Sequence, residues 1–153
     1  MKNNLPIGVF DSGLGGLTVL KALQEALPEE SYLYFGDTAH VPYGNKSQTA
    51  IINYTTRIIT FLEEKKVKII IIACNTASSL AIKKLQKHTQ IPIIDVITPT
   101  KKIIKNMLPI NKIGIIGTHN TIVSSAYNKV ISRINNKIKI YSIACPLFVP
   151  IIE

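Results

Sequence analysis

The sequence predicts an α/β fold with a doubly wound, mostly parallel sheet. Short apolar segments alternate along the 153 residues with longer segments whose apolar residues recur at helical spacing. This alternation is typical of parallel strands joined by helices that cover both faces of a sheet. A hydrophobic fraction of 46% and a charged fraction of 18% indicate a globular chain of one domain, or one domain and part of another.

Strands are expected where short apolar segments end at turns, and one of them, over Val67–Ala73, is apolar on both faces and therefore fully buried. In order, the predicted strands are Pro6–Phe10, Ser31–Phe35, Val67–Ala73, Pro92–Ile97, Lys112–Gly117 and Lys137–Ile143. Helices are expected over Leu17–Leu27, after an N-cap at Ser47, and over Thr76–His88, Thr100–Met107 and Thr121–Ile134. Pro42 and Gly44 predict a loop between Thr38 and Lys46.

The net charge of +9 does not point to nucleic acid. The lysines are spread along the chain, and arginine, the usual base-reading residue, occurs only at Arg57 and Arg133. A basic surface of this kind can still attract a small anion. The start of the chain resembles no signal peptide, and its apolar runs are too short to cross a bilayer. We therefore expect a cytoplasmic protein with neither a nucleic acid nor a membrane as partner.

Polar and reactive residues follow several predicted strands, so they should meet at one rim of the sheet. Asp11–Gly16 reads Asp-Ser-Gly-Leu-Gly-Gly, which matches neither common nucleotide-binding glycine motif but suits an anion such as a carboxylate. Asp11 could cap the helix that follows, or it could hold a substrate ammonium or orient a base. Tyr43 and Gly44 are either a plain turn with an exposed tyrosine or a wall of the site.

Cys74 is the strongest single signal, because it stands between a buried strand and the first turn of a helix. A helix N-terminus stabilises negative charge, so we expect a lowered thiol pKa and a reactive cysteine, against the alternative of an inert buried one. Cys145 lies in an apolar run and is expected to serve packing. His119 fits a catalytic role or a helix cap equally well. Neither cysteine has metal-ligand spacing, and we expect no metal.

Four segments together resemble glutamate racemase, an enzyme of the aspartate/glutamate racemase superfamily. They are GVFDSGLGGLTVL at Gly8–Leu20, YFGDTAHVPYG at Tyr34–Gly44, IIACNTASS at Ile71–Ser79 and IGIIGTHNTIVSSAY at Ile113–Tyr127. The tail ACPLFVPIIE at Ala144–Glu153 is also similar to the family at that point.

The resemblance implies two pseudo-symmetric α/β domains with the active site between them. Residues 1–97 would form the first domain, without its C-terminal return segment, and residues 98–153 would begin an incomplete second one. It implies cofactor-independent interconversion of L- and D-glutamate by two cysteines, which provides D-glutamate for peptidoglycan synthesis. A homodimer is the assembly that full-length relatives often form.

Site residues follow from the same resemblance. Cys74 matches one of the two catalytic cysteines, and Asp11 is assigned to catalysis with it. The substrate-binding positions matched are Asp11, Ser12, Tyr43, Gly44, Asn75, Thr76, Thr118 and Thr121. Glu153 matches an acid with a supporting role near the second thiol.

The second catalytic cysteine of the family lies in a Cys-Thr-His motif, and these 153 residues contain none. The sequence therefore reads as the N-terminal portion of a glutamate racemase, and we do not expect this form to turn over. Two alternatives stay open. One is a non-catalytic remnant that binds glutamate or acts as an interaction protein, and the other is a single-cysteine enzyme of the superfamily.

Overall fold

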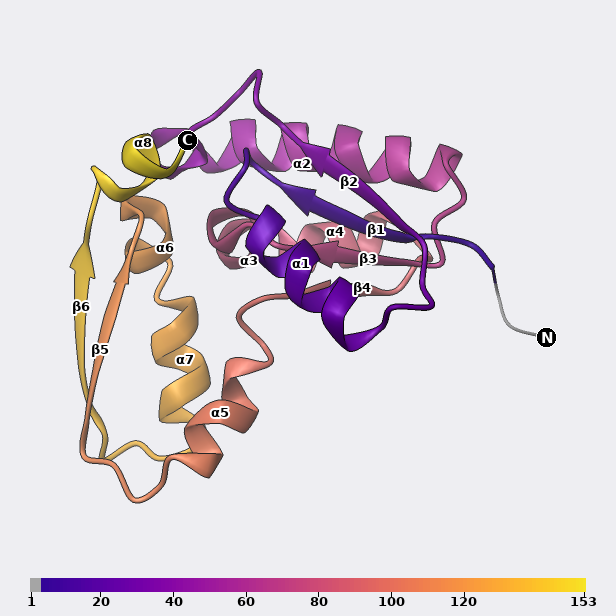
Figure 1. Cartoon of the computed structure of the whole chain (residues 1–153). Coiled ribbons are helices and arrows are strands. Elements are labelled where there is room, and N and C mark those ends of the chain that lie inside the picture. The colour runs from indigo at the N-terminus through magenta and orange to yellow at the C-terminus, as the bar shows by residue number, and fades with distance from the viewer. Residues whose placement is uncertain (1–3) are drawn as a thin grey trace.

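The structure, a computed structural model, describes residues 4–153 and contains two parallel sheets with helices packed around them (Figure 1). The larger sheet has four strands in the order β2-β1-β3-β4, and the smaller pairs β5 with β6. Every strand pairing is parallel. The α/β fold with a mostly parallel sheet, predicted from the sequence, is confirmed.

In both sheets, one or two helices connect each strand to the next. The first sheet and its helices comprise β1 (Ile7–Asp11), α1 (Leu17–Ala26), β2 (Tyr32–Gly36), η1 (Tyr43–Asn45), α2 (Gln48–Glu64), β3 (Ile69–Ile72), α3 (Asn75–Leu80), α4 (Ile82–His88) and β4 (Ile93–Asp95). The second group comprises α5 (Thr100–Asn106), β5 (Lys112–Gly117), α6 (His119–Val123), α7 (Ala126–Ser132), β6 (Lys139–Ala144) and α8 (Phe148–Ile152).

The four-stranded sheet is covered on both faces because its central strands alternate between two cores. Phe10, Ile70 and Ile72 pack on one face in a cluster that also contains buried residues of α2 and α4. Val9 and Ile71 lie on the opposite face, where Leu20 and Leu23 of α1 pack against their cluster. A doubly wound sheet needs this two-sided burial, and the all-apolar run of β3 supplies it.

Among the described residues, packed side chains cover only one of the two faces of the smaller sheet. Ile104 of α5, Ile131 of α7 and Ile138 form its core, and Ile113, Ile115, Ile134 and Ile140 pack against it. Burial therefore alternates strictly along both β5 and β6. The second face of this sheet carries exposed apolar side chains.

Two helices predicted as continuous are each divided in the structure. The segment Thr76–His88 breaks at Ala81, which ends α3 and begins α4. The segment Thr121–Ile134 breaks at Ser125, whose φ of 54° is left-handed, and α6 begins earlier, after an N-cap at Thr118. The Ser124 hydroxyl supports this break by accepting from Ala126 N at 3.2 Å. The apolar tail forms a further helix, α8, that was not predicted.

Other boundaries agree closely. Ser47 caps α2 as predicted, its hydroxyl accepting from Ala50 N at 3.2 Å, and β5 has the predicted limits. The strand predicted over Val67–Ala73 is shorter, because Ala73 and Cys74 already turn toward α3. No helix among residues 4–153 has the length and apolar character needed to cross a membrane.

The two sheets meet where α6 packs against η1 and α3. Asn120 Nδ2 donates to the carbonyl oxygens of Tyr43 at 3.1 Å and Lys46 at 2.8 Å. The backbone at Gly44 comes so close to α6 that a Cβ there would lie 2.9 Å from Cβ of Thr118. This close approach requires glycine at position 44.

A matched pair of substitutions tests this contact. Gly44→Ala should lower the free energy of unfolding by about 1–3 kcal/mol, because the added methyl group must push η1 and α6 apart. Gly114→Ala, where an added methyl would meet nothing within 4 Å, should be neutral or stabilising by up to about 1 kcal/mol. Urea unfolding followed by circular dichroism measures both, and equal effects would contradict the close packing.

Candidate functional site

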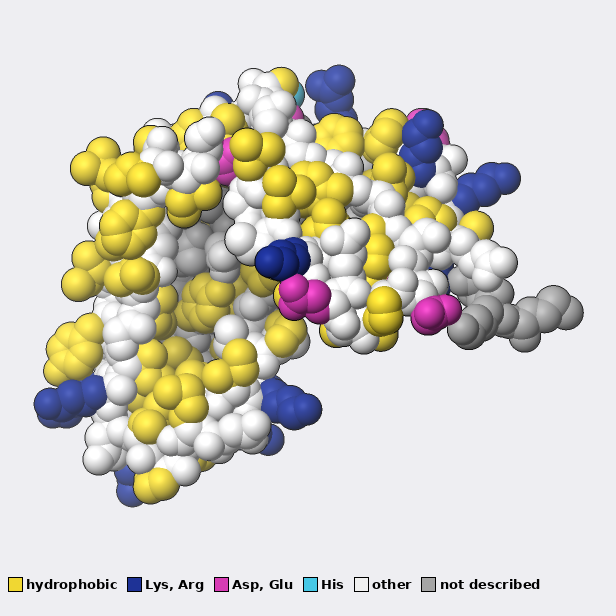
Figure 2. Space-filling model, in the orientation of Figure 1, with side chains coloured by type: hydrophobic (Ala, Val, Ile, Leu, Met, Phe, Trp, Pro, Cys, Tyr) yellow, Lys and Arg dark blue, Asp and Glu magenta, His cyan; other side chains and the backbone are white. Residues whose placement is uncertain are grey.

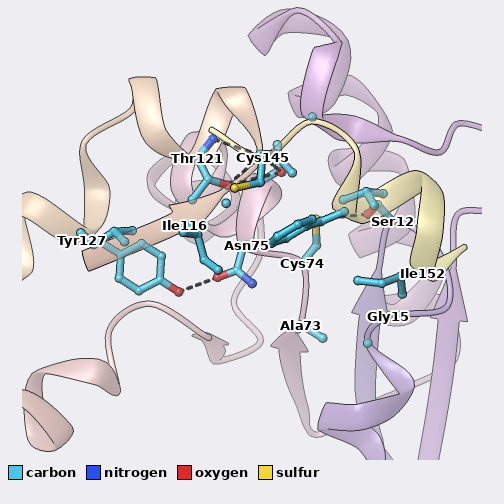
Figure 3. A pocket seen from close by; sticks show the side chains of 18 of the residues that line it. Ser12, Gly15, Ala73, Cys74, Asn75, Ile116, Thr121, Tyr127, Cys145 and Ile152 are labelled. Atoms are coloured by element: carbon cyan, nitrogen blue, oxygen red, sulfur yellow. Dashed lines mark hydrogen bonds between the residues drawn. The ribbon is translucent and has the colours of Figure 1, made fainter. Parts of the chain in front are cut away.

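A cavity of about 610 Å³ lies at the carboxyl ends of β1, β3 and β5 (Figure 3). All the residues assigned to the site from the sequence line this one cavity. They are Asp11, Ser12, Tyr43, Gly44, Cys74, Asn75, Thr76, Thr118, Thr121 and Glu153. The position agrees with the rule that ligands of parallel sheets bind beyond the carboxyl ends of the strands. What each residue does there stays a prediction.

Cys74 is the N-cap residue of α3 and lies two residues after Ile72, the last residue of β3. Its Sγ accepts from Ala77 N and lies 3.4 Å from the hydroxyl oxygen of Ser12, so the thiol is tied to both neighbouring turns. The side chain is buried.

The expectation that the helix N-terminus lowers the thiol pKa is wrong for this structure. Burial raises the pKa of Cys74 above its ordinary value, and the nearby charge of Asp11 raises it further. Hydrogen bonds from Ser12 and Ala77 oppose these effects without cancelling them. The surroundings of Cys74 therefore favour its thiol form over the thiolate.

Asp11 holds the glycine loop together from the end of β1. Its Oδ2 accepts from Gly13 N at 3.0 Å and from Gly16 N at 3.1 Å. Burial raises the pKa of this carboxyl group, while the backbone hydrogen bonds oppose the shift. Asp11 therefore binds the backbone of the loop that precedes α1, whose N-cap residue Gly16 has no side-chain cap, and the alternative that it holds a substrate ammonium stays a prediction.

The same loop binds a carboxylate, as its glycines predicted, and that carboxylate belongs to the chain itself. Glu153 Oε2 accepts from Leu14 N at 2.8 Å, and Oε1 accepts from Gly15 N at 3.4 Å. These two hydrogen bonds hold the end of α8 against the loop. Negative charge from Glu153 also contributes to the raised pKa of Asp11.

Tyr43 is a buried anchor, so the interpretation of an exposed turn tyrosine is wrong. Only 1% of its surface is exposed, and its hydroxyl donates to Asp37 Oδ2 at 2.6 Å. Burial and this hydrogen bond raise the pKa of Tyr43 far above its ordinary value. The buried ring fixes η1, so that Gly44 lines the cavity.

Three threonine hydroxyls from both sheets form a cluster at the cavity wall. Thr76 Oγ1 lies 2.8 Å from Thr118 Oγ1, and Thr118 Oγ1 lies 3.0 Å from Thr121 Oγ1. Thr118 also caps α6 through its side chain. His119 is exposed at the start of that helix, and the N-cap residue is its neighbour Thr118. Hydroxyls that can both donate and accept suit a carboxylate ligand.

The sequence analysis missed two contributors to this cavity. Tyr127 donates to Asn75 Oδ1 at 2.5 Å and thereby orients that amide (Figure 3). Cys145 lines the cavity as well, although packing alone was expected for it. Its place directly after β6 could have indicated this, since the carboxyl ends of parallel strands share one edge. Within residues 4–153, no three His, Cys, Asp or Glu side chains are grouped to hold a metal ion.

A family model described as Asp/Glu/Hydantoin racemase matches residues 7–149. The chain belongs to this family. It is 48% identical over 147 residues to glutamate racemase of Geobacter metallireducens, covering 96% of this chain and 54% of that protein. The relative from Aquifex aeolicus is 44% identical, with 97% and 58% covered.

A solved structure agrees with this assignment. Glutamate racemase of Francisella tularensis, in complex with D-glutamate, superposes with a TM-score of 0.90 at 47% identity, covering 97% of this chain and 56% of that one. The chain thus spans about half the length of the racemases it matches and corresponds to their N-terminal portion.

The raised thiol pKa can be tested by alkylation in a Cys145→Ser background, where Cys74 alone reacts. The rate of iodoacetamide modification should increase with pH to a midpoint above that of a free cysteine peptide, because only the thiolate reacts. Asp11→Asn removes a negative charge near the thiol and should move the midpoint to lower pH.

Glu25→Gln, which removes a charge from the exposed side of α1, serves as the control and should leave the midpoint unchanged. A wild-type midpoint below that of the free peptide would contradict the raised pKa.

Proposed function

We propose that this chain provides the Cys74 side of a glutamate racemase site. The observation that carries the proposal is the position of the Cys74 thiol in the cavity, beside Ser12 and flanked by hydrogen-bonding groups from both sheets. Family membership supports it, as does the D-glutamate complex of the Francisella protein. In this proposal, residues 1–97 and 98–153 belong to two α/β domains that share the site.

Cys74 would act as the acid and base at the α-carbon. As a thiolate it takes the α-proton, leaving the electron pair on a carbanion that the substrate carboxylate delocalises, and as a thiol it returns a proton to that carbon. Such a carbanion needs positioned donors in a site shielded from water. This chemistry uses only protein groups and substrate, without a cofactor.

In this proposal, one set of polar groups in the cavity binds the substrate ammonium and another set binds the substrate carboxylates. We assign Asp11 Oδ1 and the Ser12 hydroxyl to the substrate ammonium, since Asp11 Oδ2 is already engaged with the glycine loop. The donors left for the substrate carboxylates are on η1, α3 and α6. They are Gly44, Asn75, Thr76, Thr118 and Thr121. Tyr43 holds η1 in place through its buried ring and its hydrogen bond to Asp37.

The raised pKa of Cys74 also fits a substrate-assisted step. An ammonium bound at Asp11 would neutralise the charge that helps to hold the thiol protonated. The thiolate would then form when substrate is present and remain scarce when the site is empty. In the cell, we propose that the complete enzyme acts in the cytoplasm and supplies D-glutamate for peptidoglycan.

Proton exchange tests the proposal. In D₂O, the chain should replace the α-hydrogen of one glutamate enantiomer by deuterium, because a single thiol exchanges its proton with solvent and returns deuterium to the same face. Cys74→Ser should lower this rate by about 100-fold or more. Proton NMR of the α-hydrogen measures it.

Thr60→Ala, on the exposed side of α2 away from the cavity, is the control and should exchange at the wild-type rate. Exchange that persists in Cys74→Ser, or its absence with both enantiomers in the wild type, would contradict the proposal.

A further inference from the structure

The side-chain amide of Asn75 has one free end in the cavity. Asn75 is the first residue of α3, follows Cys74 directly and lines the cavity. Its Oδ1 accepts from the Tyr127 hydroxyl at 2.5 Å, and among residues 4–153 its Nδ2 has no hydrogen-bond partner. Figure 3 shows the amide oxygen turned toward Tyr127 and the nitrogen turned away from it. The free end of the amide is therefore a hydrogen-bond donor.

A ligand can reach this donor from solvent. Asn75 is exposed, and Figure 2 shows the surface hollowed between the part of the molecule that carries the first sheet and the part that carries β5, β6 and α8. Residues of both parts line the cavity. The free Nδ2 can thus contact a ligand that enters the cavity between them.

The Tyr127 hydroxyl fixes which end of the amide is free. An asparagine amide that turns by half a rotation exchanges its oxygen and nitrogen, so an unrestrained Asn75 could offer the cavity either an acceptor or donors. Burial raises the pKa of Tyr127, so its hydroxyl keeps the proton that it donates. In the described part of the chain this hydroxyl has no other acceptor, and a turned amide would leave its proton unpaired. Asn75 is therefore held with its donor toward the cavity.

The helix break at Ser125 brings Tyr127 to Asn75. Thr121 of α6 already contacts α3, with its Oγ1 3.5 Å from Thr76 Oγ1. In one continuous helix, Tyr127 would lie about 120° around the axis from Thr121 and would point away from α3. The left-handed Ser125, with a φ of 54°, restarts the helix as α7, and the Tyr127 hydroxyl then meets Asn75. Backbone held in such a sparsely populated region is typical of functional sites.

We propose that Tyr127 is a positioning residue that makes the cavity select a ligand carboxylate over a carboxamide at Asn75. This role rests on the proposed function, which places a substrate carboxylate against Asn75. The two oxygens of a carboxylate only accept hydrogen bonds, so a carboxylate pairs fully with fixed donors. A carboxamide brings an NH₂ group that needs an acceptor, and Asn75 could supply one only by turning its Oδ1 toward the ligand. The hydrogen bond from Tyr127 prevents that turn.

Ligand affinities measure this selection. Glutamine and isoglutamine each replace one carboxylate of glutamate by a carboxamide, so one of the two compounds presents its carboxamide to Asn75. The wild-type chain should bind glutamate more tightly than either compound in isothermal titration calorimetry. Tyr127→Phe keeps the ring and removes the hydroxyl, so the preference for glutamate over one of the two amides should fall by roughly tenfold. General loosening of the site would instead weaken the binding of all three ligands alike.

A double-mutant cycle shows whether Tyr127 acts through Asn75. In an Asn75→Ala background, Tyr127→Phe should leave the preference for glutamate unchanged, because no amide is left to position. Tyr141→Phe is the matched control, since it removes the same hydroxyl from an exposed tyrosine of β6 that does not line the cavity. Its preference should equal that of the wild type. Circular dichroism checks that each variant is folded.

Nuclear magnetic resonance tests the orientation of the amide without a ligand. The order parameter of the Asn75 side-chain amide should be lower in Tyr127→Phe than in the wild type. An unchanged order parameter, an unchanged preference in Tyr127→Phe, or an equal change in the Asn75→Ala background would each overturn the proposed role of Tyr127. If the wild-type chain binds none of the three compounds, the proposed function fails, and the order parameter alone then decides the role of Tyr127.

Discussion

The cavity depends on one contact, the packing of α6 against η1 and α3. The Asn120 amide binds two carbonyl oxygens of the η1 segment, and the hydroxyls of Thr76 and Thr118 meet at 2.8 Å. This contact joins two sheets whose cores are otherwise separate. Through this contact, α6 and its N-cap Thr118 lie across the cavity from the groups at the ends of β1 and β3. The absence of a side chain at Gly44 is the steric condition for this contact.

Electrostatics give the cavity a character opposite to that of the whole chain. The net charge is +9, yet the charged group that acts on the Cys74 thiol is the carboxylate of Asp11. Asp11 places negative charge near a buried sulfur atom, so the thiolate is disfavoured until a cation reaches that carboxylate. A zwitterionic ligand with two carboxylates would bring that cation to Asp11 and its anionic groups to the donors of α3 and α6.

Sequence reasoning recovered the fold class, because each strand is marked by an apolar run and each crossover by helical spacing. It also located the rim, because residues that follow parallel strands share one edge. It failed where a local choice depends on distant packing. No proline or glycine marks the helix breaks at Ala81 and Ser125. The predicted direction of the pKa shift of Cys74 was wrong, because the thiol becomes buried and comes close to Asp11 only when the chain folds.

Contacts between residues far apart in the chain were not predicted from the sequence, because they also depend on distant packing. Nothing in the local pattern around Glu153 shows that its carboxylate reaches Leu14 and Gly15. The hydrogen bond from Tyr127 to Asn75 likewise spans 52 residues. By contrast, every residue that the family resemblance assigned to the site lines the cavity. A family resemblance carries information about which residues meet in space, and the spacing of residues along one sequence does not.

We propose that Cys74 lies within a cavity, built by both sheets, that binds glutamate. The most direct test of this proposal is protection of Cys74 from iodoacetamide in the Cys145→Ser background at fixed pH. Glutamate should slow alkylation saturably, because a ligand held between Asp11 and the threonine cluster covers the sulfur. 4-Aminobutyrate, which lacks the α-carboxylate, should protect far less. An alkylation rate that glutamate leaves unchanged, or that both compounds slow equally, would contradict the account.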